Sequence, residues 1–475
     1  MASNARPRPN AHRRTWPGWL AWLVVVALLV ASAWYASGPL ARDQGWLVDG
    51  GSPTVDPAVI TELHPQTEVL GAGVIDPPPT PHPSRVDPAR VEQLMADNQP
   101  DLPGLYSAAI ADLAGGPLAY DQDASAAVVP ASTMKVMLAV AVLDALGPQH
   151  TFTTSVVMPS PATIVLVGGG DPLLASTPTS YPFADTVAPP STEELAARTA
   201  AALTAQGITE VSLGYDDSLF AGPVWHPDWP EADRQFVAPI SALVVDEAAD
   251  QPGVESASPA AAATFAEQLR ANGIKVVGQP SVASAAGGEQ VAAIDSLPVS
   301  LLVQELLVHS NNFIAEMLLR QLALADDRPA SFDGGTSALT ARLTTLGLWT
   351  DGQLIADGSG LSMNNRLTTG ELVAALQLAA GRDDLAAVLA GMPVAKATGT
   401  LANRFMDARS EPARGQVRAK TGTLDQVSGL AGYTPTADGT LLAFALLGNE
   451  LPRDQDVRGW FDHVAAALAG CDCAA

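Results

Sequence analysis

The order of its segments predicts that this chain adopts an α+β fold with an inserted block. A strand and a long apolar helix come first, residues 151–294 have a different texture, and further helices follow them. The chain then closes with two strand-like runs and a helix. We expect the first and last strands to share one sheet, as they do in α+β domains.

Length and composition support a globular protein of more than one domain. At 475 residues the chain exceeds one ordinary core, so two or three domains are expected. Hydrophobic residues make up 47% and charged residues 16%, as in folded proteins. The formal net charge of −25 argues against a nucleic-acid partner, because phosphate backbones are bound by basic faces.

The N-terminal residues predict a membrane anchor. Residues 16–37 carry no charge, are long enough to cross a bilayer as a helix, and have aromatic residues at both ends. Residues 1–15 contain four arginines, so this tail is expected to be cytoplasmic and the long C-terminal part to lie outside the cytoplasm. A cleaved signal peptide is the alternative, since Ala31-Ser32-Ala33 is an acceptable cleavage site. Either way the body is exported.

Residues 38–88 are expected to form a proline-rich tether. They include Asp76-Pro-Pro-Pro-Thr-Pro-His-Pro83, which cannot lie inside a helix, and they show no sustained hydrophobic period. The folded body therefore begins at about residue 89.

The first part of the body, residues 89–150, is predicted to contain a helix, a hairpin and a second helix. Apolar residues alternate in the first strand, and a glycine pair marks the turn of the hairpin. The second helix is apolar and ends at Gly147-Pro148, a stop signal. The expected bounds are Val91–Met95, Leu105–Ala111, Leu118–Tyr120 and Pro130–Leu146.

Residues 151–294 are interpreted as one inserted domain or a pair of them. The strand Thr163–Val167 precedes Gly168-Gly-Gly-Asp-Pro172, which invites comparison with a phosphate-binding loop. No Gly-Lys-Ser/Thr follows and Pro172 interrupts the expected helix start, so a structural turn is the better interpretation. Two amphipathic helices, Glu193–Gln206 and Ala260–Asn272, are expected between short strands.

Residues 295–475 are expected to complete the domain that residues 89–150 begin. Hydrophobic periodicity predicts three helices and two strands in this part. The helices are expected over Leu301–Leu324, Leu372–Ala380 and Val457–Leu468, and the strands over Gly429–Tyr433 and Leu441–Leu447.

The first of three short motifs pairs a serine with a lysine. Ser132 opens a helix and Lys135 follows three residues later, so both side chains lie on one helix face. The helix N-terminus offers positive potential to a developing oxyanion, and a lysine whose amine is neutral can take the serine proton. A lysine in a motif is informative here, because the chain has only four.

The other two motifs supply hydroxyl, amide and ammonium groups. Ser310 and Asn312 lie two apart on a turn, where the hydroxyl can face Lys135 and the amide can face a substrate carbonyl. Lys420-Thr-Gly-Thr423, at the start of a strand, offers a cation, a hydroxyl and a glycine against which substrate can lie. All three motifs in this order favour a serine acyl-transfer enzyme over a helix pair and two turns.

Other chemistries fit the sequence poorly. It contains no His-Glu-x-x-His pair and no Gly-x-Ser-x-Gly elbow, and His309 is better explained as a helix-end residue than as a base. Lys396-Ala-Thr-Gly-Thr400 is interpreted as a loop. Cys471 and Cys473 are too close for an easy disulfide and have no histidine cluster nearby, so they are interpreted as incidental. We expect no metal and no cofactor.

The motifs and their spacing resemble the D-alanyl-D-alanine carboxypeptidase/endopeptidase family of low-molecular-mass penicillin-binding proteins. This family belongs to the penicilloyl-serine transferase superfamily, and a large insert between the first two motifs is typical of it. The resemblance covers residues 90–470. Further similar stretches are Leu166–Pro172, Asp217–Phe220, Val237–Leu243, Asn312–Glu316, Asp357–Ser362 and Gly399–Phe405.

The resemblance implies a β-lactamase/transpeptidase-like domain, an antiparallel sheet flanked by helices, that acts on peptidoglycan stem peptides and is inhibited by β-lactams. It implies that Ser132 is the acylated nucleophile, Lys135 its proton acceptor and Ser310 a relay toward the leaving amine. The backbone N–H groups of Ser132 and Thr423 would form the oxyanion hole. The implied substrate-binding residues are Asn312 for the peptide and Lys420, Thr421, Gly422 and Thr423 around the terminal carboxylate.

The sequence departs from the family pattern at two positions, and rival functions stay open. Asn311 stands where aspartate is often found. Met363 stands where arginine is often found, which leaves a charged contact to a diaminopimelate-type stem peptide without support from this position. A β-lactamase is the first rival, but the glutamates here do not fit the pattern of its deacylating base. A wall-binding scaffold without turnover is the second, but it would have no need of the intact Ser132 and Lys135.

Overall fold

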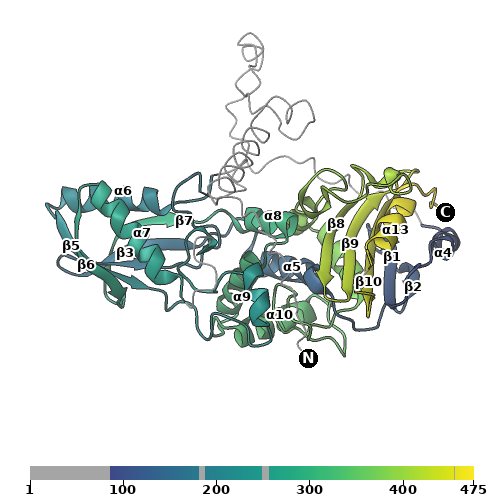
Figure 1. Ribbon diagram of the computed structural model, residues 1–475, viewed down its shortest axis with the longest axis horizontal. Coiled ribbons are helices and arrows are strands. Elements are labelled where there is room, and N and C mark those ends of the chain that lie inside the picture. The colour runs from purple at the N-terminus through teal and green to yellow at the C-terminus, as the bar shows by residue number, and fades with distance from the viewer. Residues whose placement is uncertain (1–85, 181–187, 249–255, 454) are drawn as a thin grey trace, which may run out of the picture. The chain divides into compact units, whose positions relative to one another are not determined.

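The computed structural model describes residues 86–180, 188–248, 256–453 and 455–475, which contain helices and two five-stranded sheets (Figure 1). The predicted tail, anchor and nearly all of the tether fall outside these residues. Within the described ranges, no helix is both long and apolar enough to span a membrane.

The first sheet joins the beginning of the folded body to its end. β1 pairs with β10 in register from Leu105 opposite Asn449 to Asp112 opposite Leu442. The prediction of an α+β fold in which the first and last strands share a sheet is therefore confirmed. The antiparallel order of this sheet is β2 (Leu118–Gln122), β1 (Leu105–Asp112), β10 (Leu441–Asn449), β9 (Val427–Pro435) and β8 (Arg418–Leu424).

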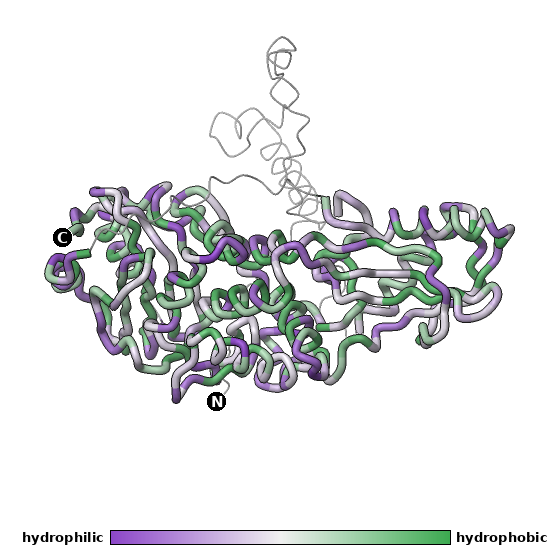
Figure 2. Tube along the Cα trace, turned by 180° about the vertical axis from the view of Figure 1, so that it is seen from behind, coloured by the Kyte–Doolittle hydropathy of each residue, from purple (hydrophilic) through white to green (hydrophobic). Residues whose placement is uncertain are grey.

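Helices cover both faces of the first sheet. Alternate residues of a strand point to opposite faces, and in β1 both sets are packed against helices. Ala109 and Ala111 pack into the core that contains the long apolar helix α5 (Met134–Leu146). Ala108 and Ile110 pack on the other side, with α13 (Gly459–Ala469). β10 is buried along its whole length, which explains its uninterrupted apolar run. In Figure 2 the hydrophobic colour follows these interior strands and helices.

Two of the remaining helices around the first sheet were not predicted. Glycines and threonines interrupt the apolar pattern of Phe332–Thr345, and Ala386–Ala390 has only five residues. The helices are α4 (Pro88–Asp97), α8 (Val299–His309), α9 (Asn312–Ala325), α10 (Phe332–Thr345), α11 (Thr369–Ala380) and α12 (Ala386–Ala390), with short 3-10 turns η1 (Ala131–Thr133) and η5 (Gly399–Leu401).

The single helix expected over Leu301–Leu324 is two helices, so that prediction was wrong. α8 ends at His309, and Ser310 then adopts a left-handed conformation with φ of 56°. The Asn311 side chain caps α9 by accepting the backbone N–H of Ile314 at 3.0 Å. The apolar period continues across the break, so periodicity alone does not reveal it.

The second sheet is mixed and comes entirely from residues 153–295. α6 (Thr192–Ala205) and α7 (Ser258–Ala271) pack against it in a separate core. These elements lie almost entirely within residues 151–294, and the division of the chain into domains stays a prediction. The strand order is β6 (Lys275–Val282), β5 (Glu210–Asp216), β4 (Thr163–Val167), β3 (Thr153–Ser160) and β7 (Glu289–Asp295), with β4, β5 and β6 parallel and the rest antiparallel.

The glycine loop after β4 packs closely against neighbouring backbone. A Cβ atom at Gly168 would lie 2.4 Å from the carbonyl oxygen of Ala242, and one at Gly169 would lie 2.1 Å from that of Thr153. No side chain fits in so little space. These contacts account for the glycines and support the interpretation as a structural turn.

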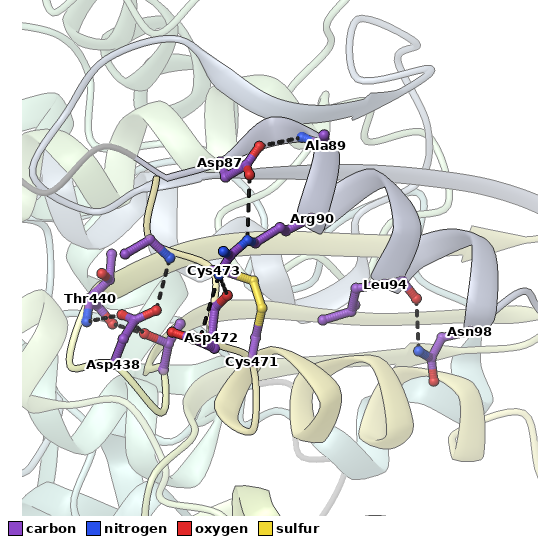
Figure 3. Close-up of a disulfide and its surroundings, with 12 residues drawn as sticks. Asp87, Ala89, Arg90, Leu94, Asn98, Asp438, Thr440, Cys471, Asp472 and Cys473 are labelled. Carbon is purple, nitrogen blue, oxygen red and sulfur yellow. Dashed lines mark hydrogen bonds and ion pairs between the residues drawn. A yellow bond between two sulfur atoms is a disulfide. The ribbon is translucent and has the colours of Figure 1, made fainter.

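Cys471 and Cys473 form a disulfide, which corrects the prediction that they are incidental (Figure 3). Their Cα atoms lie 5.3 Å apart, within the range that a disulfide needs, so proximity in sequence was a poor guide. The linked residues follow α13 and lie beside α4. The carbonyl of Cys473 accepts the backbone N–H of Asp87 at 2.8 Å, which fastens the C-terminus to the beginning of the body.

Candidate active site

Ser132 and Lys135 lie together at the beginning of α5. Ser132 is in the 3-10 turn η1, and α5 begins two residues later at Met134. Lys135 is in the first turn of α5, its side chain is fully buried, and its Nζ lies 2.8 Å from Ser132 Oγ. The structure thus places the two residues as the first motif predicts.

The surroundings of Lys135 suit a neutral amine. Its Nζ also lies 2.7 Å from Asn312 Oδ1 and 2.5 Å from the backbone oxygen of Ser359, and both of these atoms can only accept hydrogen bonds. A neutral amine has two N–H groups for these acceptors and one lone pair left. That lone pair is available to accept the hydroxyl proton of Ser132.

The electrostatics of Lys135 favour the same protonation state. Burial lowers the pKa of Lys135 to about 7, although the nearby carboxyl groups of Asp357 and Glu316 act to raise it. A substantial fraction of Lys135 is therefore unprotonated near neutral pH, as a general base requires.

Lys420 approaches Ser310 from β8. It is the third residue of that strand rather than its first, and its Nζ lies 2.7 Å from Ser310 Oγ and 2.8 Å from the backbone oxygen of Thr421. Burial, and then the charge of Lys135, lower the pKa of Lys420 well below its usual range. A bound anion would counteract both effects, which makes this position suited to an anionic substrate group.

β8 lies at the edge of the first sheet and offers backbone groups to a ligand. The N–H of Ala419 points away from β9, because it donates to the carbonyl of Pro393 at 3.0 Å. Backbone direction alternates along a strand, so the N–H groups of Thr421 and Thr423 point to the same outer edge. Further along this edge, Thr421 Oγ1 lies 2.9 Å from Thr400 Oγ1.

The structure explains the glycine at position 422 differently from the prediction. A Cβ atom there would lie 2.8 Å from the carbonyl oxygen of Pro130 and 3.2 Å from the Cβ of Ala131. Glycine at this position lets the turn with Ser132 pack directly on β8. It thereby brings the serine close to the strand edge, whereas the sequence suggested that it makes room for substrate.

Asn312 connects Lys135 to the inserted residues. Its Oδ1 faces Lys135, and its Nδ2 donates to the backbone oxygen of Phe236 at 2.9 Å. The neighbouring Asn311 donates to Glu247 Oε1 at 2.7 Å in addition to capping α9. The second motif therefore holds the beginning of α9 in place as well as lining the site.

Sequence reasoning assigned no role to the loop of residues 357–362, which lies against the serine turn. Gly360 has φ of +82°, and a Cβ atom there would lie 2.0 Å from the carbonyl oxygen of Ala131. Asp357 holds this loop by accepting the N–H groups of Gly360 at 2.7 Å and Ser362 at 2.6 Å. The resemblance covers this stretch, but its contact with Lys135 depends on tertiary structure.

The same family is found when the chain is compared with known proteins. A model of the D-Ala-D-Ala carboxypeptidase 3 (S13) family matches residues 88–260 and 251–468. A carboxypeptidase of Mycobacterium tuberculosis is 34% identical over 429 residues, which cover 86% of this chain and 89% of the relative. Carboxypeptidase DacB of Mycolicibacterium smegmatis is 32% identical, over 84% of this chain and 91% of the relative.

The fold also has a solved counterpart. The crystal structure of penicillin-binding protein 4 from Haemophilus influenzae superposes with a TM-score of 0.65 at 23% sequence identity. The superposition covers 80% of this chain and 98% of that structure. At this level of identity the likeness shows that the two chains share a fold.

Proposed function

The chain belongs to the D-Ala-D-Ala carboxypeptidase 3 (S13) family of hydrolases, and from this premise we propose that it removes the terminal D-alanine of peptidoglycan stem peptides through an acyl-enzyme at Ser132. The observation that best supports this is the fully buried Lys135, with a pKa of about 7 and its Nζ 2.8 Å from Ser132 Oγ.

In the first step, Lys135 takes the hydroxyl proton of Ser132 while Oγ attacks the carbonyl carbon of the penultimate D-alanine. The oxyanion that forms lies at the beginning of α5 and accepts the backbone N–H groups of Ser132 and Thr423. The peptide C–N bond then breaks, and the leaving amine takes the proton that Lys135 removed from Ser132, relayed through Ser310, so that Lys135 is neutral again. The acyl group is left as an ester on Ser132.

In the second step, water replaces the leaving amine. Lys135 takes a proton from this water, which attacks the ester carbonyl, and Ser132 Oγ leaves with a proton in return. During the first step, before the terminal D-alanine leaves, Lys420, Thr421 and Thr423 hold its carboxylate along the edge of β8. The carboxylate restores the positive charge of Lys420 that burial opposes.

We extend the proposal to β-lactams and to crosslinked peptides. Penicillin-binding protein 4 of H. influenzae has also been crystallised with a β-lactam. A β-lactam resembles the D-alanyl-D-alanine end, so it is expected to acylate Ser132 and to stay bound after ring opening. A crosslink presents the same peptide bond with a larger leaving group, so endopeptidase activity at the same serine is expected as well.

Purified crosslinked muropeptides test the function directly. The full chain is incubated with them and the products are identified by mass. Loss of one alanine supports the carboxypeptidase, separation of crosslinked halves supports the endopeptidase, and Ser132→Ala must abolish both. Absence of products together with absence of penicillin labelling on folded protein would instead indicate a wall-binding scaffold, and rapid penicillin turnover would indicate a β-lactamase.

The location of the protein is a separate part of the proposal. The uncharged residues 16–37, with their aromatic ends, support a membrane anchor that keeps the body outside the cytoplasm. The full-length protein should then fractionate with membranes and resist a salt wash. Recovery of a soluble form that begins at Trp34 would show that the segment is a cleaved signal peptide.

A further inference from the structure

Glu316 is a buried carboxyl group that the proposed chemistry does not use. It lies one helical turn after Asn312 on α9 and has no exposed surface. Its Oε1 accepts the backbone N–H groups of Gly358 at 3.1 Å and Ser359 at 2.7 Å. Its Oε2 meets no donor with good hydrogen-bond geometry among the described residues, while the Ser359 side chain acts to lower the pKa of the carboxyl group. A buried carboxyl group with an unpaired oxygen is costly, so it calls for an explanation.

The two N–H groups that Glu316 binds belong to the loop that faces Lys135. Asp357 accepts the next N–H groups of that loop, so two carboxyl groups hold its donors. With its donors held in this way, the loop presents the carbonyl of Ser359 to Lys135 Nζ at 2.5 Å. Glu316 therefore acts on the lysine through one intervening residue.

We propose that Glu316 is a positioning residue for Lys135, which fixes the Ser359 carbonyl against the lysine amine and whose charge controls how readily that amine loses its proton. The inference rests on the proposed function, since it takes Ser132 as the nucleophile and Lys135 as its base.

The charges around the pair support this coupling. Burial, and then the charge of Asp357, raise the pKa of Glu316 to about 8, while the hydrogen bonds from the loop act to lower it. The other charged groups that act on the pair are Lys420 of β8, which faces Lys135, and Arg320 of α9, which faces Glu316. The guanidinium of Arg320 donates to backbone carbonyls, including that of Ala330 at 2.7 Å, rather than to Glu316 Oε2.

These values place the loss of a proton from Lys135 and from Glu316 in the same pH range. When Lys135 and Glu316 together hold one proton, the form that can accept the Ser132 proton has a protonated Glu316 and a neutral amine on Lys135. The unproductive form has an ammonium on Lys135 and a carboxylate on Glu316. Glutamine at position 316 removes the second form but keeps an oxygen that can accept the two loop N–H groups.

The pH dependence of Ser132 acylation by labelled penicillin tests the inference. In the wild type the rate should rise as Lys135 loses its proton. In E316Q this rise should move to lower pH by about half a unit, because no carboxylate remains to favour the ammonium. In E316A the rate should fall by about 100-fold at every pH, because the loop is no longer held. Asp171→Asn is the matched control. Asp171 is also buried, and burial raises its pKa to about 7, but its Oδ1 accepts the N–H of Leu173, directly after the glycine loop.

The outcomes separate the inference from the proposed function. No labelling of folded wild type at Ser132 would overturn the proposed function itself. Normal labelling of the wild type, with an unshifted profile in E316Q or an equal shift in D171N, would overturn the role of Glu316. If E316Q shows no cooperative thermal transition, E316D replaces it, since it keeps the charge but withdraws it from the loop by one methylene. A wild-type rate in folded E316D would then overturn the positioning role, and a rate about tenfold lower would support it.

Discussion

The two sheets of this chain differ in how deeply their charged side chains are buried. In the first sheet and the helices packed on it, Lys135, Lys420 and Glu316 have no exposed surface, and the pKa of each is displaced far from its usual value. In the second sheet, Lys275 of β6 pairs with Glu210 of β5 at 2.8 Å, but both side chains are more than half exposed. Burial makes the first group of charges costly and shifts their pKa values, whereas water screens the second pair.

The backbones of the two sheets differ in the same sense. β9 and β10 are covered on both faces, whereas β6 exposes most of its residues. A change beside the first sheet should therefore alter chemistry and stability together. A change in the second sheet should alter stability at most.

The largest expected effect compares a lysine from each region. Lys135→Ala should slow penicillin acylation of Ser132 by about 10²–10⁴-fold, because the nucleophile loses its base. Lys275→Ala should leave the rate unchanged, because it removes only an exposed ion pair. Labelling kinetics of both purified variants measure this, and an equal loss of rate would remove the distinction between the regions.

A pair of glycines sharpens the comparison. Gly360→Ala places a Cβ atom 2.0 Å from the carbonyl of Ala131, and Gly169→Ala places one 2.1 Å from the carbonyl of Thr153. Both should lower the free energy of unfolding by at least about 2 kcal/mol, since backbone must move. Only Gly360→Ala should also slow acylation of the folded protein, because it displaces the serine turn. Denaturant unfolding and labelling of the folded fraction separate the two effects.

A third prediction divides the site itself into nucleophile and carboxylate-binding parts. Lys420→Ala should lose at least about 2 kcal/mol of transition-state stabilisation on peptides with a free C-terminal carboxylate. On a C-terminally amidated analogue the loss should be smaller, because no charge-assisted contact is made. Specific activities on the two peptides provide the measurement. Equal losses would show that Lys420 does not bind the carboxylate.

The smallest effect is expected at the C-terminal disulfide. Replacing both Cys471 and Cys473 by serine should lower the free energy of unfolding by about 1–2 kcal/mol, since the closed loop is short. Acylation should stay at the wild-type rate, because the disulfide packs against α4 and α13 rather than against the site. Thermal unfolding and penicillin labelling check both parts. A reduced labelling rate would show that the disulfide affects the reactivity of Ser132.

How far the sequence predicted this structure depended on whether a feature is local. Ser132 and Lys135 lie on one helical turn, so their spacing was enough to predict that they meet. The sharing of one sheet by the first and last strands followed from the order of the segments, which is typical of α+β domains. The break at Ser310 was missed in the helix assignment, because capping chemistry rather than hydrophobic periodicity produces it.

Contacts between residues far apart in the chain could not be predicted from the sequence. The oxygen of Ser359 meets Lys135 from 224 positions further along the chain, and Glu316 acts through that same loop. No local pattern connects these positions. Gly422 was noted as part of a motif, but the sequence did not reveal that glycine there allows close packing of a turn almost three hundred residues earlier.

The pairing of β1 with β10 also has a consequence for biosynthesis. Leu105 is paired with Asn449, so in a chain made from its N-terminus β1 can pair with β2 at once but lacks β10 until almost all residues have emerged. The strands of the second sheet lie within residues 153–295, so they can pair much earlier. Meanwhile Ser132 has no β8 edge to face, since Lys420 is still to come. We therefore expect the proposed acylation of Ser132 by penicillin only after β8 has been made and has paired, so that labelling would report a folded catalytic body.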